Sequence, residues 1–219
     1  MEVKLDSIGY GTRILVRDIA FSVAPGECLL LAGANGCGKT TLLKALAGEG
    51  APTPAKCVLI PTGIPKVKGF TVEEFIRTGC YRESDWAGRL RKGTARRMEE
   101  ALELLGLQAL SNRDISTLSD GEFQKACLAT GITRGARLLL LDEPTAFLDV
   151  GNRLMVLHAL QETALRSGTA VIFSSHDLAD ALEVARRVLA ITPDGRFLES
   201  GKENREAILS AAFPAWKSR

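Results

Sequence analysis

"GANGCGKT" at Gly33–Thr40 decides the fold of this chain, because it matches the phosphate-loop pattern G-x-x-x-x-G-K-[ST]. The apolar run Glu27–Gly33 before it reads as a strand, and Lys39–Ala47 after it reads as a helix. Glycines let the backbone approach a phosphate closely, and a helix N-terminus turns N–H groups toward it. This context predicts a bound nucleoside triphosphate; the alternative is a glycine-rich turn with a chance lysine.

The two residues that end the loop carry the predicted chemistry. Lys39 binds the β- and γ-phosphates in such a loop, and the Thr40 hydroxyl ligates Mg²⁺. ATP and Mg²⁺ are therefore the expected cofactors. Cys37 either fills a place that needs a small residue or carries a thiol that bound ATP shields. The other loop residues expected at the nucleotide are Gly33, Asn35, Gly36, Gly38 and Thr41.

"LLLLDEP" at Leu138–Pro144 supplies two adjacent acids at the end of an apolar strand. Asp142 falls where a metal-binding acid is needed, and Glu143 follows it at the strand exit. One acid beside Mg²⁺ and one left to handle a proton is an arrangement suited to activating water. The alternative is a strand end with two solvated acids.

The other apolar runs indicate an α/β fold. They lack strict alternation, which is typical of parallel strands that are buried on both faces. Helical segments separate them, as right-handed crossovers require. The expected strands are Glu27–Gly33, Lys56–Pro61, Arg137–Glu143, Thr169–Ser175 and Arg187–Thr192, and the expected helices are Lys39–Ala47, Val150–Arg166 and Leu178–Arg186.

Two segments depart from this rhythm. The chain through Pro25 reads as antiparallel strands closed by a Pro-Gly turn. Residues 63–134 contain "TVEEFIRTG", "TARRMEEALELLGLQAL" and "GEFQKACLATGIT", which are helical in period and composition. We therefore expect a single domain over residues 1–219 with an all-helical lobe inserted at 63–134. "GIPKVKG" at Gly63–Gly69 is expected to be a flexible joint leading into it.

"LSDGEFQKACLA" at Leu118–Ala129 looks like an ordinary helix start. Ser119 at the N-cap and Glu122 three residues later form the pattern of a capping box. Whether this turn is only a cap or also touches a ligand is left open by the residues themselves.

Composition narrows the class of protein. The chain has 219 residues, 46% hydrophobic content and a net charge of +2. This near balance predicts no strong attraction to nucleic acid, so no nucleic-acid partner is expected. Five scattered cysteines without a CxxC pair suit a reducing cytosol. With no signal peptide and no long apolar run, we expect a cytoplasmic protein that another chain would hold at a membrane.

Taken in order, the motifs resemble those of the nucleotide-binding subunit of an ABC transporter, from about Val3 to Gly201. Gly33–Thr40 is similar to Walker A, and Leu138–Asp142 to Walker B, with Glu143 where the family has its catalytic glutamate. Leu118–Glu122, "LSDGE", is similar to the signature motif, with Asp and Glu replacing the usual Gly and Gln.

Three further positions carry the resemblance. "AFLD", which ends at Asp149, is similar to the D-loop, and "SSHD" places His176 at the switch histidine. Tyr10 stands where the family stacks an aromatic ring on adenine. A structural histidine and a tyrosine packed on the surface are the respective alternatives.

The resemblance implies a P-loop NTPase core with an N-terminal antiparallel β subdomain and an inserted helical lobe. It implies a homodimer in which Ser119 and Gly121 of one subunit contact ATP held by the other. Glu143, His176 and Lys39 would then be the catalytic residues. Glu122 is either a ligand residue or only part of the helix cap.

One position departs from the family. Where the family has a glutamine that touches Mg²⁺, "VLIPTGIP" has Thr62. A threonine side chain is shorter and would reach the metal through water. Thr62 is therefore a candidate metal residue of a modified kind.

Details around the motifs resemble the ATPases of bacterial importers for iron–siderophores, heme and cobalamin. Such a subunit works on the inner face of the cell membrane with integral permease subunits, and indirectly with an external substrate-binding protein. An exporter ATPase, a soluble ABC-type ATPase acting on DNA or ribosomes, and a regulatory binder without turnover are the alternatives. A basic cluster is either a solvated helix face or a docking edge for the permease or anionic lipid; its members are Arg82, Arg89, Arg91, Lys92, Arg96 and Arg97.

Overall fold

The computed structural model describes residues 1–48, 57–86, 89–201 and 204–213, without the side chain of Arg82. At its centre lies a six-stranded sheet with the order β4-β5-β6-β3-β7-β8, in which only β8 runs antiparallel to its neighbour. The strands are β3 Cys28–Gly33, β4 Cys57–Ile60, β5 Leu138–Leu141, β6 Ala170–Ser174, β7 Arg187–Ile191 and β8 Phe197–Glu199. The predicted parallel sheet is thus confirmed.

Alternate residues of the parallel strands enter two different hydrophobic cores. Leu29 and Leu31 of β3 pack into one core, while Leu30 of the same strand packs into the other. All three side chains are fully buried. Because successive side chains of a strand point to opposite faces, an uninterrupted apolar run is what a sheet covered on both sides requires.

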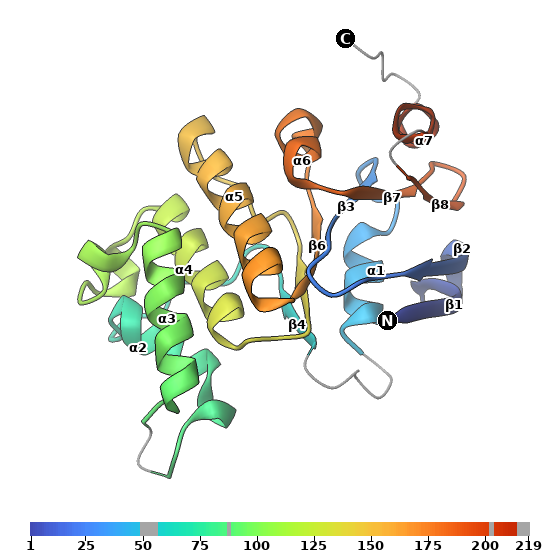
Figure 1. Cartoon of the computed structure of the whole chain (residues 1–219). Helices are drawn as coiled ribbons and strands as arrows, with labels where there is room; N and C mark the ends of the chain where they lie inside the picture. The colour runs from blue at the N-terminus through green and yellow to red at the C-terminus, as the bar shows by residue number, and fades with distance from the viewer. Residues whose placement is uncertain (49–56, 87–88, 202–203, 214–219) are drawn as a thin grey trace.

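A two-stranded antiparallel ribbon and one helix cover the first face (Figure 1). The ribbon consists of β1 Glu2–Tyr10 and β2 Arg13–Ser22, and the helix is α1 Lys39–Leu46. Antiparallel pairing was expected here, but the turn was misplaced. The ribbon turns at residues 11–12, and the Pro-Gly pair at 25–26 leads instead into β3.

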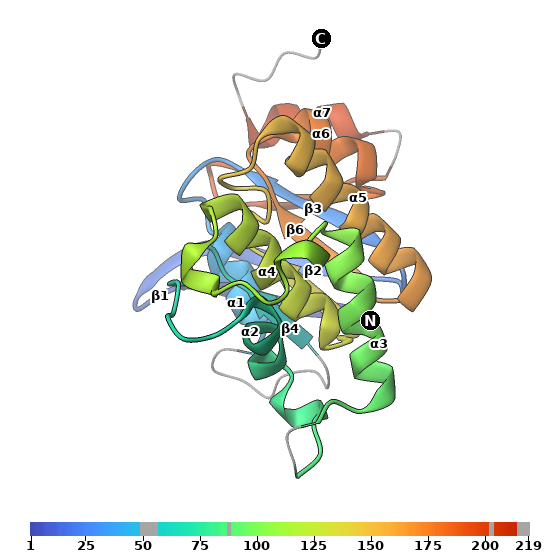
Figure 2. The ribbon, with the colours of Figure 1, turned by 90° about the vertical axis from the view of Figure 1, so that its left-hand side faces the viewer.

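Helices cover the second face, and Figure 2 shows α2, α3 and α4 gathered together on that side. They are α2 Val72–Gly79, α3 Lys92–Leu104, α4 Asp120–Thr133, α5 Val150–Ser167, α6 Leu178–Val184 and α7 Arg205–Ala212, with short 3-10 turns η1 Tyr81–Glu83, η2 Gln108–Leu110 and η3 Ile115–Thr117. No helix in the described ranges is long and apolar enough to cross a bilayer.

Two helices are shorter than the sequence predicted, and one strand was not predicted. The expected helix at 94–110 stops at Leu104, because Gly106 takes a φ of +62° and the chain restarts as η2. The helix α6 ends at Val184, two residues early, and Arg187 begins β7. The strand β8 has only three half-buried residues, too few for a recognisable pattern.

Candidate nucleotide site

The phosphate loop joins the carboxyl end of β3 to the N-terminus of α1. Gly38 precedes the helix with a φ of +114°, a conformation that a residue with a Cβ rarely adopts. The Lys39 ammonium is buried and donates hydrogen bonds to the main-chain oxygens of Gly33 (2.8 Å) and Ala34 (3.1 Å). The lysine therefore lies folded inside its own loop, where a phosphate oxygen could replace these carbonyl partners.

The acid of the second motif lies against the loop. The Thr40 hydroxyl donates to Asp142 Oδ2 at 2.6 Å, and the Ser174 hydroxyl donates to Asp142 Oδ1 at 2.8 Å. Asp142 is only 7% exposed. A hydroxyl beside a carboxylate matches the oxygen ligands that Mg²⁺ prefers. Thr40 and Asp142 could therefore hold a magnesium ion, which would supply charge to neutralise the phosphates.

Thr62 lies at the same edge of the sheet but does not reach this carboxylate. Its hydroxyl donates to the main-chain oxygen of Asp142 at 3.1 Å. The Thr62 side chain thus contacts the backbone of the predicted metal-binding acid and not its carboxylate, so direct contact with a metal, as expected of the family glutamine, is not supported here.

Glu143 and His176 meet directly. The Glu143 carboxylate is in close contact with His176 Nε2, and the Glu143 N–H donates to the Ser174 hydroxyl at 2.9 Å. Glu143 has a φ of +52°, an uncommon value for a residue other than glycine. Such strain persists where the surroundings enforce it, and it is concentrated at functional sites. This backbone turns the carboxylate toward the histidine at the mouth of the site.

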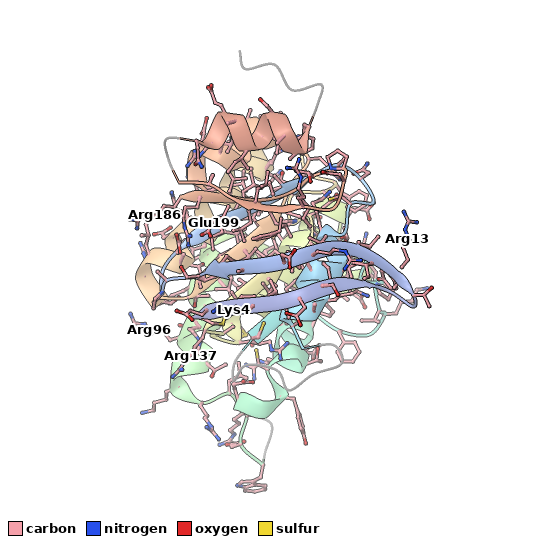
Figure 3. All side chains as sticks on the ribbon, turned by 90° about the vertical axis from the view of Figure 1, so that its right-hand side faces the viewer. Lys4, Arg13, Arg96, Arg137, Arg186 and Glu199 are labelled. Carbon is pink, nitrogen blue, oxygen red and sulfur yellow. The ribbon has the colours of Figure 1, made fainter. Side chains whose placement is uncertain are left out.

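A cavity of about 590 Å³ is lined by the phosphate loop, the N-terminal ribbon, Glu143 and His176, but not by Asp142. From the N-terminal ribbon come Tyr10, Arg13 and Leu15, and Tyr10 is 62% exposed. Figure 3 shows Arg13 at the turn end of this ribbon, far from Lys4. The other lining residues are Asn35, Gly36, Gly38, Lys39, Thr40, Thr41, Glu143 and His176.

Arg13 was not predicted as a site residue. It pairs with Tyr10 across the ribbon and shares a strand face with Leu15, two residues on. Arg13 can be placed beside Tyr10 and Leu15 at the cavity only when the register of the β1–β2 hairpin is known. The sequence pattern predicts the turn at Pro25–Gly26 instead, so it gives no reason to place Arg13 at the site.

Cys37 is half-buried inside the loop. Its Sγ lies 2.6 Å from where a Cβ on Gly33 would stand. The Ile191 main-chain oxygen lies 2.7 Å from the same point, and this backbone contact leaves room only for glycine at position 33. Burial raises the pKa of the Cys37 thiol, although the Lys39 charge and backbone N–H groups partly oppose the rise. The thiol is therefore less reactive at neutral pH than its exposure alone would indicate.

The turn before α4 forms the predicted capping box. Ser119 Oγ accepts from the Glu122 N–H at 3.2 Å, and Glu122 Oε2 accepts from the Ser119 N–H at 2.7 Å. These bonds from the Ser119 backbone and hydroxyl lower the pKa of Glu122. The cap reading is confirmed, and the turn's role toward a ligand stays a prediction.

Ser119, Gly121 and Asp149 do not line the cavity with the phosphate loop. Gly121 instead packs on the segment 146–149, since a Cβ there would lie 3.0 Å from Leu148 Cδ2. Asp149 caps α5 and accepts the Asn152 N–H at 2.8 Å. The exposed Ser119 and Asp149 therefore stand on turns that pack together, outside the site of their own chain.

A second cavity of about 550 Å³ continues from Glu143 and His176 along residues 145–148. Arg153 lines it and bonds to Asp177, in a close contact, and to Asp180 at 3.5 Å. Neither Arg153 nor Asp177 was predicted. Their contact links α5, which carries Arg153, to the segment immediately after His176.

The predicted basic cluster does not form one uniform face. Arg89, Arg91 and Lys92 are exposed. Arg96 pairs with Glu100 at 2.8 Å, and Arg97 donates to the Thr133 main-chain oxygen at 2.9 Å. The solvated and docking readings of the cluster both stay predictions.

Comparison with known proteins agrees with this site. A family model described as ABC transporter matches residues 16–146. A probable siderophore transport system ATP-binding protein of Bacillus subtilis (strain 168) is 30% identical over 215 residues, covering 90% of this chain and 78% of the relative. An iron(3+)-hydroxamate import ATP-binding protein of the same strain is 32% identical over 203 residues, covering 84% and 76%.

Solved structures agree on the fold. A nucleotide-free ATP-binding cassette from an ABC transporter has a TM-score of 0.79 at 20% identity, with 100% of each chain covered. An inward-facing ABC transporter of the metal-chelate type has a TM-score of 0.83 at 24% identity, covering 97% of this chain and 88% of the other. The chain therefore belongs to the ABC transporter family, as an ATPase subunit.

Proposed function

We propose that two copies of this chain bind Mg-ATP and power a membrane importer for a chelated-iron cargo. One observation carries the proposed ATP hydrolysis. A continuous series of contacts beside the phosphate loop joins Thr40 to Asp142, Asp142 to Ser174, Ser174 to Glu143, and Glu143 to His176. The cargo class rests on relatives whose names give siderophore transport, iron(3+)-hydroxamate import and petrobactin import.

In the proposed reaction, Lys39 leaves its carbonyl partners and binds the β- and γ-phosphates. Thr40 and Asp142 would hold a magnesium ion, which would neutralise charge on the phosphates, while Tyr10 and Arg13 would close the cavity over the nucleotide. Glu143 accepts a proton from the attacking water, and His176 orients that carboxylate and the γ-phosphate. Positioning and electrostatic stabilisation would supply most of the rate enhancement.

The second half of the site would come from a partner copy. Ser119 and Gly121 stand on an exposed helix N-terminus, whose N–H groups favour a phosphate. Because they do not line their own chain's cavity, a twofold dimer would bring the Ser119 turn of each copy to the ATP of the other. Residues 63–134 would then move as one lobe, on the inner face of the membrane, against integral permease subunits and indirectly an external binding protein.

Mixing two inactive variants tests the shared site. Lys39→Ala should abolish tight ATP binding, and Ser119→Arg should abolish hydrolysis at the site that its turn completes while leaving ATP binding by the monomer near normal. A dimer of one variant with the other contains one intact site, so the mixture should regain hydrolysis that neither variant has alone. A mixture that stays inactive, or a wild-type rate per molecule independent of protein concentration, would contradict the proposal.

The contact between Glu143 and His176 favours turnover over the alternative of a regulatory binder. An exporter or a soluble ABC-type assembly has no relative named here in its support. Steady-state Mg-ATP hydrolysis, measured with and without the co-expressed permease, separates these readings. Stimulation by the permease is expected.

A further inference from the structure

Lys66 lies in the segment Gly63–Gly69, which the sequence predicts to be a flexible joint. Its ammonium donates to the Leu118 main-chain oxygen at 2.7 Å and to Asp120 Oδ1 at 2.7 Å. It also lies 5.9 Å from the centre of the Phe123 ring, within the range of a cation–π contact. The side chain is 28% exposed. Lys66 therefore attaches this segment to the turn that carries Ser119.

The three partners of Lys66 surround the start of α4. Leu118 precedes the N-cap Ser119, Asp120 is the first helical residue, and Phe123 lies one turn on. Leu118 and Phe123 are buried in the same core, which anchors the turn from below. Lys66 contacts the other side of the turn, and its bonds to Leu118 and Asp120 restrain the backbone that carries the Ser119 hydroxyl and the Gly121 N–H.

Just before this segment, Thr62 contacts the edge of the sheet that carries Asp142. Thr62 bonds to the main-chain oxygen of Asp142, whose carboxylate bonds to Thr40. Only three residues, 63–65, therefore lie between Thr62, which contacts the predicted Mg²⁺-binding acid, and Lys66, which contacts the Ser119 turn. Residues 62–66 thus form a strap between the two places. Two of the three departures from the usual family motifs, Thr62 and Asp120, take part in its end contacts; the third, Glu122, does not bond to it.

Stability alone does not account for the strap. Asp120 is 74% exposed, and exposed ion pairs add little to the stability of a fold. The bond to the Leu118 carbonyl, in contrast, restrains a backbone group next to the helix cap.

We propose that Lys66 is a positioning residue that holds the Ser119 turn in the orientation that meets the nucleotide of a partner copy. It does so directly, through Leu118 and Asp120, and it links that orientation to the Asp142 edge through Thr62. The inference rests on the proposed shared site, because a turn needs this orientation only if a second copy docks against it.

Lys66→Met tests the idea, with Lys68→Met as its matched control. Both residues belong to the same segment, but Lys68 is exposed and has no bond to the turn. Dimerisation is measured by sedimentation against ATP concentration, with Glu143→Gln added to every chain to stop hydrolysis. We expect Lys66→Met to raise the ATP concentration for half-maximal dimer by about tenfold, the effect of losing one charge-assisted hydrogen bond.

Three further readouts separate positioning from a structural role. Lys66→Arg should restore most of the dimer, because it keeps a charged donor. With Glu143 intact, Lys66→Met should raise the protein and ATP concentrations needed for half-maximal rate, while kcat at saturation stays near wild type. In a double-mutant cycle, Asp120→Asn should add little to Lys66→Met.

The inference is overturned if Lys66→Met dimerises like Lys68→Met, or if it unfolds or loses ATP binding as a monomer. Absence of an ATP-dependent dimer even in the chain with Lys66 and Lys68 intact is a different result. It would overturn the shared site itself, and the role of Lys66 with it.

Discussion

At the scale of single residues, the site depends on side chains whose backbone or surroundings are unusual. Glu143 takes a left-handed φ of +52°, and Lys39 is buried against its own loop carbonyls. The first feature directs the Glu143 carboxylate toward His176, and the second keeps the Lys39 ammonium inside the loop that would bind the phosphates. Reactivity at these positions should therefore respond to small chemical changes that leave the fold intact.

Replacing the carboxylate of Glu143 by an amide should stop turnover without loss of ATP binding. Gln has the same shape but cannot accept the proton from water, so we expect Glu143→Gln to lower kcat by about 10²–10⁴. Glu103→Gln, an exposed position on α3, is the control. A kcat close to wild type would remove Glu143 from the role of general base.

Bound nucleotide should protect Cys37. Because burial raises the pKa of this thiol, its thiolate fraction at pH 7 is below that of a free cysteine, and its alkylation rate should rise steeply with pH. Mass spectrometry resolves Cys37 from the other four cysteines. We expect slower labelling by iodoacetamide in the presence of Mg-ATP; equal rates with and without it would contradict the placement of the loop.

At the scale of elements, two helices start with the same device. α2 has a capping box between Thr71 and Glu74, and α4 has one between Ser119 and Glu122. Only the second capping box was predicted from the sequence. Their local chemistry is equivalent, so any difference between them must come from what each turn meets.

The two caps form a natural pair of variants. Thr71→Ala and Ser119→Ala should each lower the free energy of unfolding by about 1 kcal/mol, the usual effect of losing a cap. Only Ser119→Ala should also lower ATP hydrolysis, since Thr71 is not on the proposed interface. Denaturant unfolding and steady-state rates measure the two effects. Equal loss of activity in both variants would mean that the Ser119 turn is a cap and nothing more.

At the scale of the whole molecule, one arginine at the start of β7 bonds to residues in or next to three other strands. Arg187 donates to both carboxylate oxygens of Glu27 at 2.6 and 2.7 Å, to Glu199 in a close contact, and to the Ser22 main-chain oxygen at 2.6 Å. Ser22 ends β2, Glu27 immediately precedes β3 and Glu199 ends β8, while Arg187 itself begins β7. The network fastens the ribbon to the central sheet at the end away from Arg13.

This network should make stability depend on pH in acid. Burial raises the pKa of Glu27, but hydrogen bonds from Arg187 and from the Ala24 N–H outweigh it, so the pKa lies below the ordinary value of 4.5. A depressed pKa means that the stabilisation is complete above that value and is lost as the pH falls through the lower folded value. Acid should therefore weaken the attachment of the ribbon.

Glu27→Gln is the matching variant. We expect it to lower the free energy of unfolding at pH 7 by about 1–3 kcal/mol, because the Arg187 guanidinium loses one of its two charged partners and keeps only Glu199. Below about pH 4.5 the difference from wild type should shrink. Thermal unfolding against pH measures both, with the exposed Glu2→Gln as control. A gap that stays constant down to pH 3 would show that the carboxylate charge is not the cause.

Motifs and buried strands could be predicted because their signals are local. The loop at Gly33–Thr40, the acids Asp142 and Glu143, and the apolar runs of the sheet are each read within a few residues. The hairpin turn, β8 and the break at Gly106 were missed, since a short strand or a single left-handed residue leaves a weak pattern.

The sequence by itself determined the phosphate loop, the acids, the helix cap and the parallel sheet, because a glycine pattern or an apolar run acts on its own neighbourhood. Only the tertiary structure decided that Arg13 joins the cavity, that Thr62 bonds to the backbone of Asp142, and that Lys66 grips the Leu118 carbonyl. These contacts join residues far apart along the chain. Their distances follow from how the sheet, ribbon and helices pack, which no local pattern specifies.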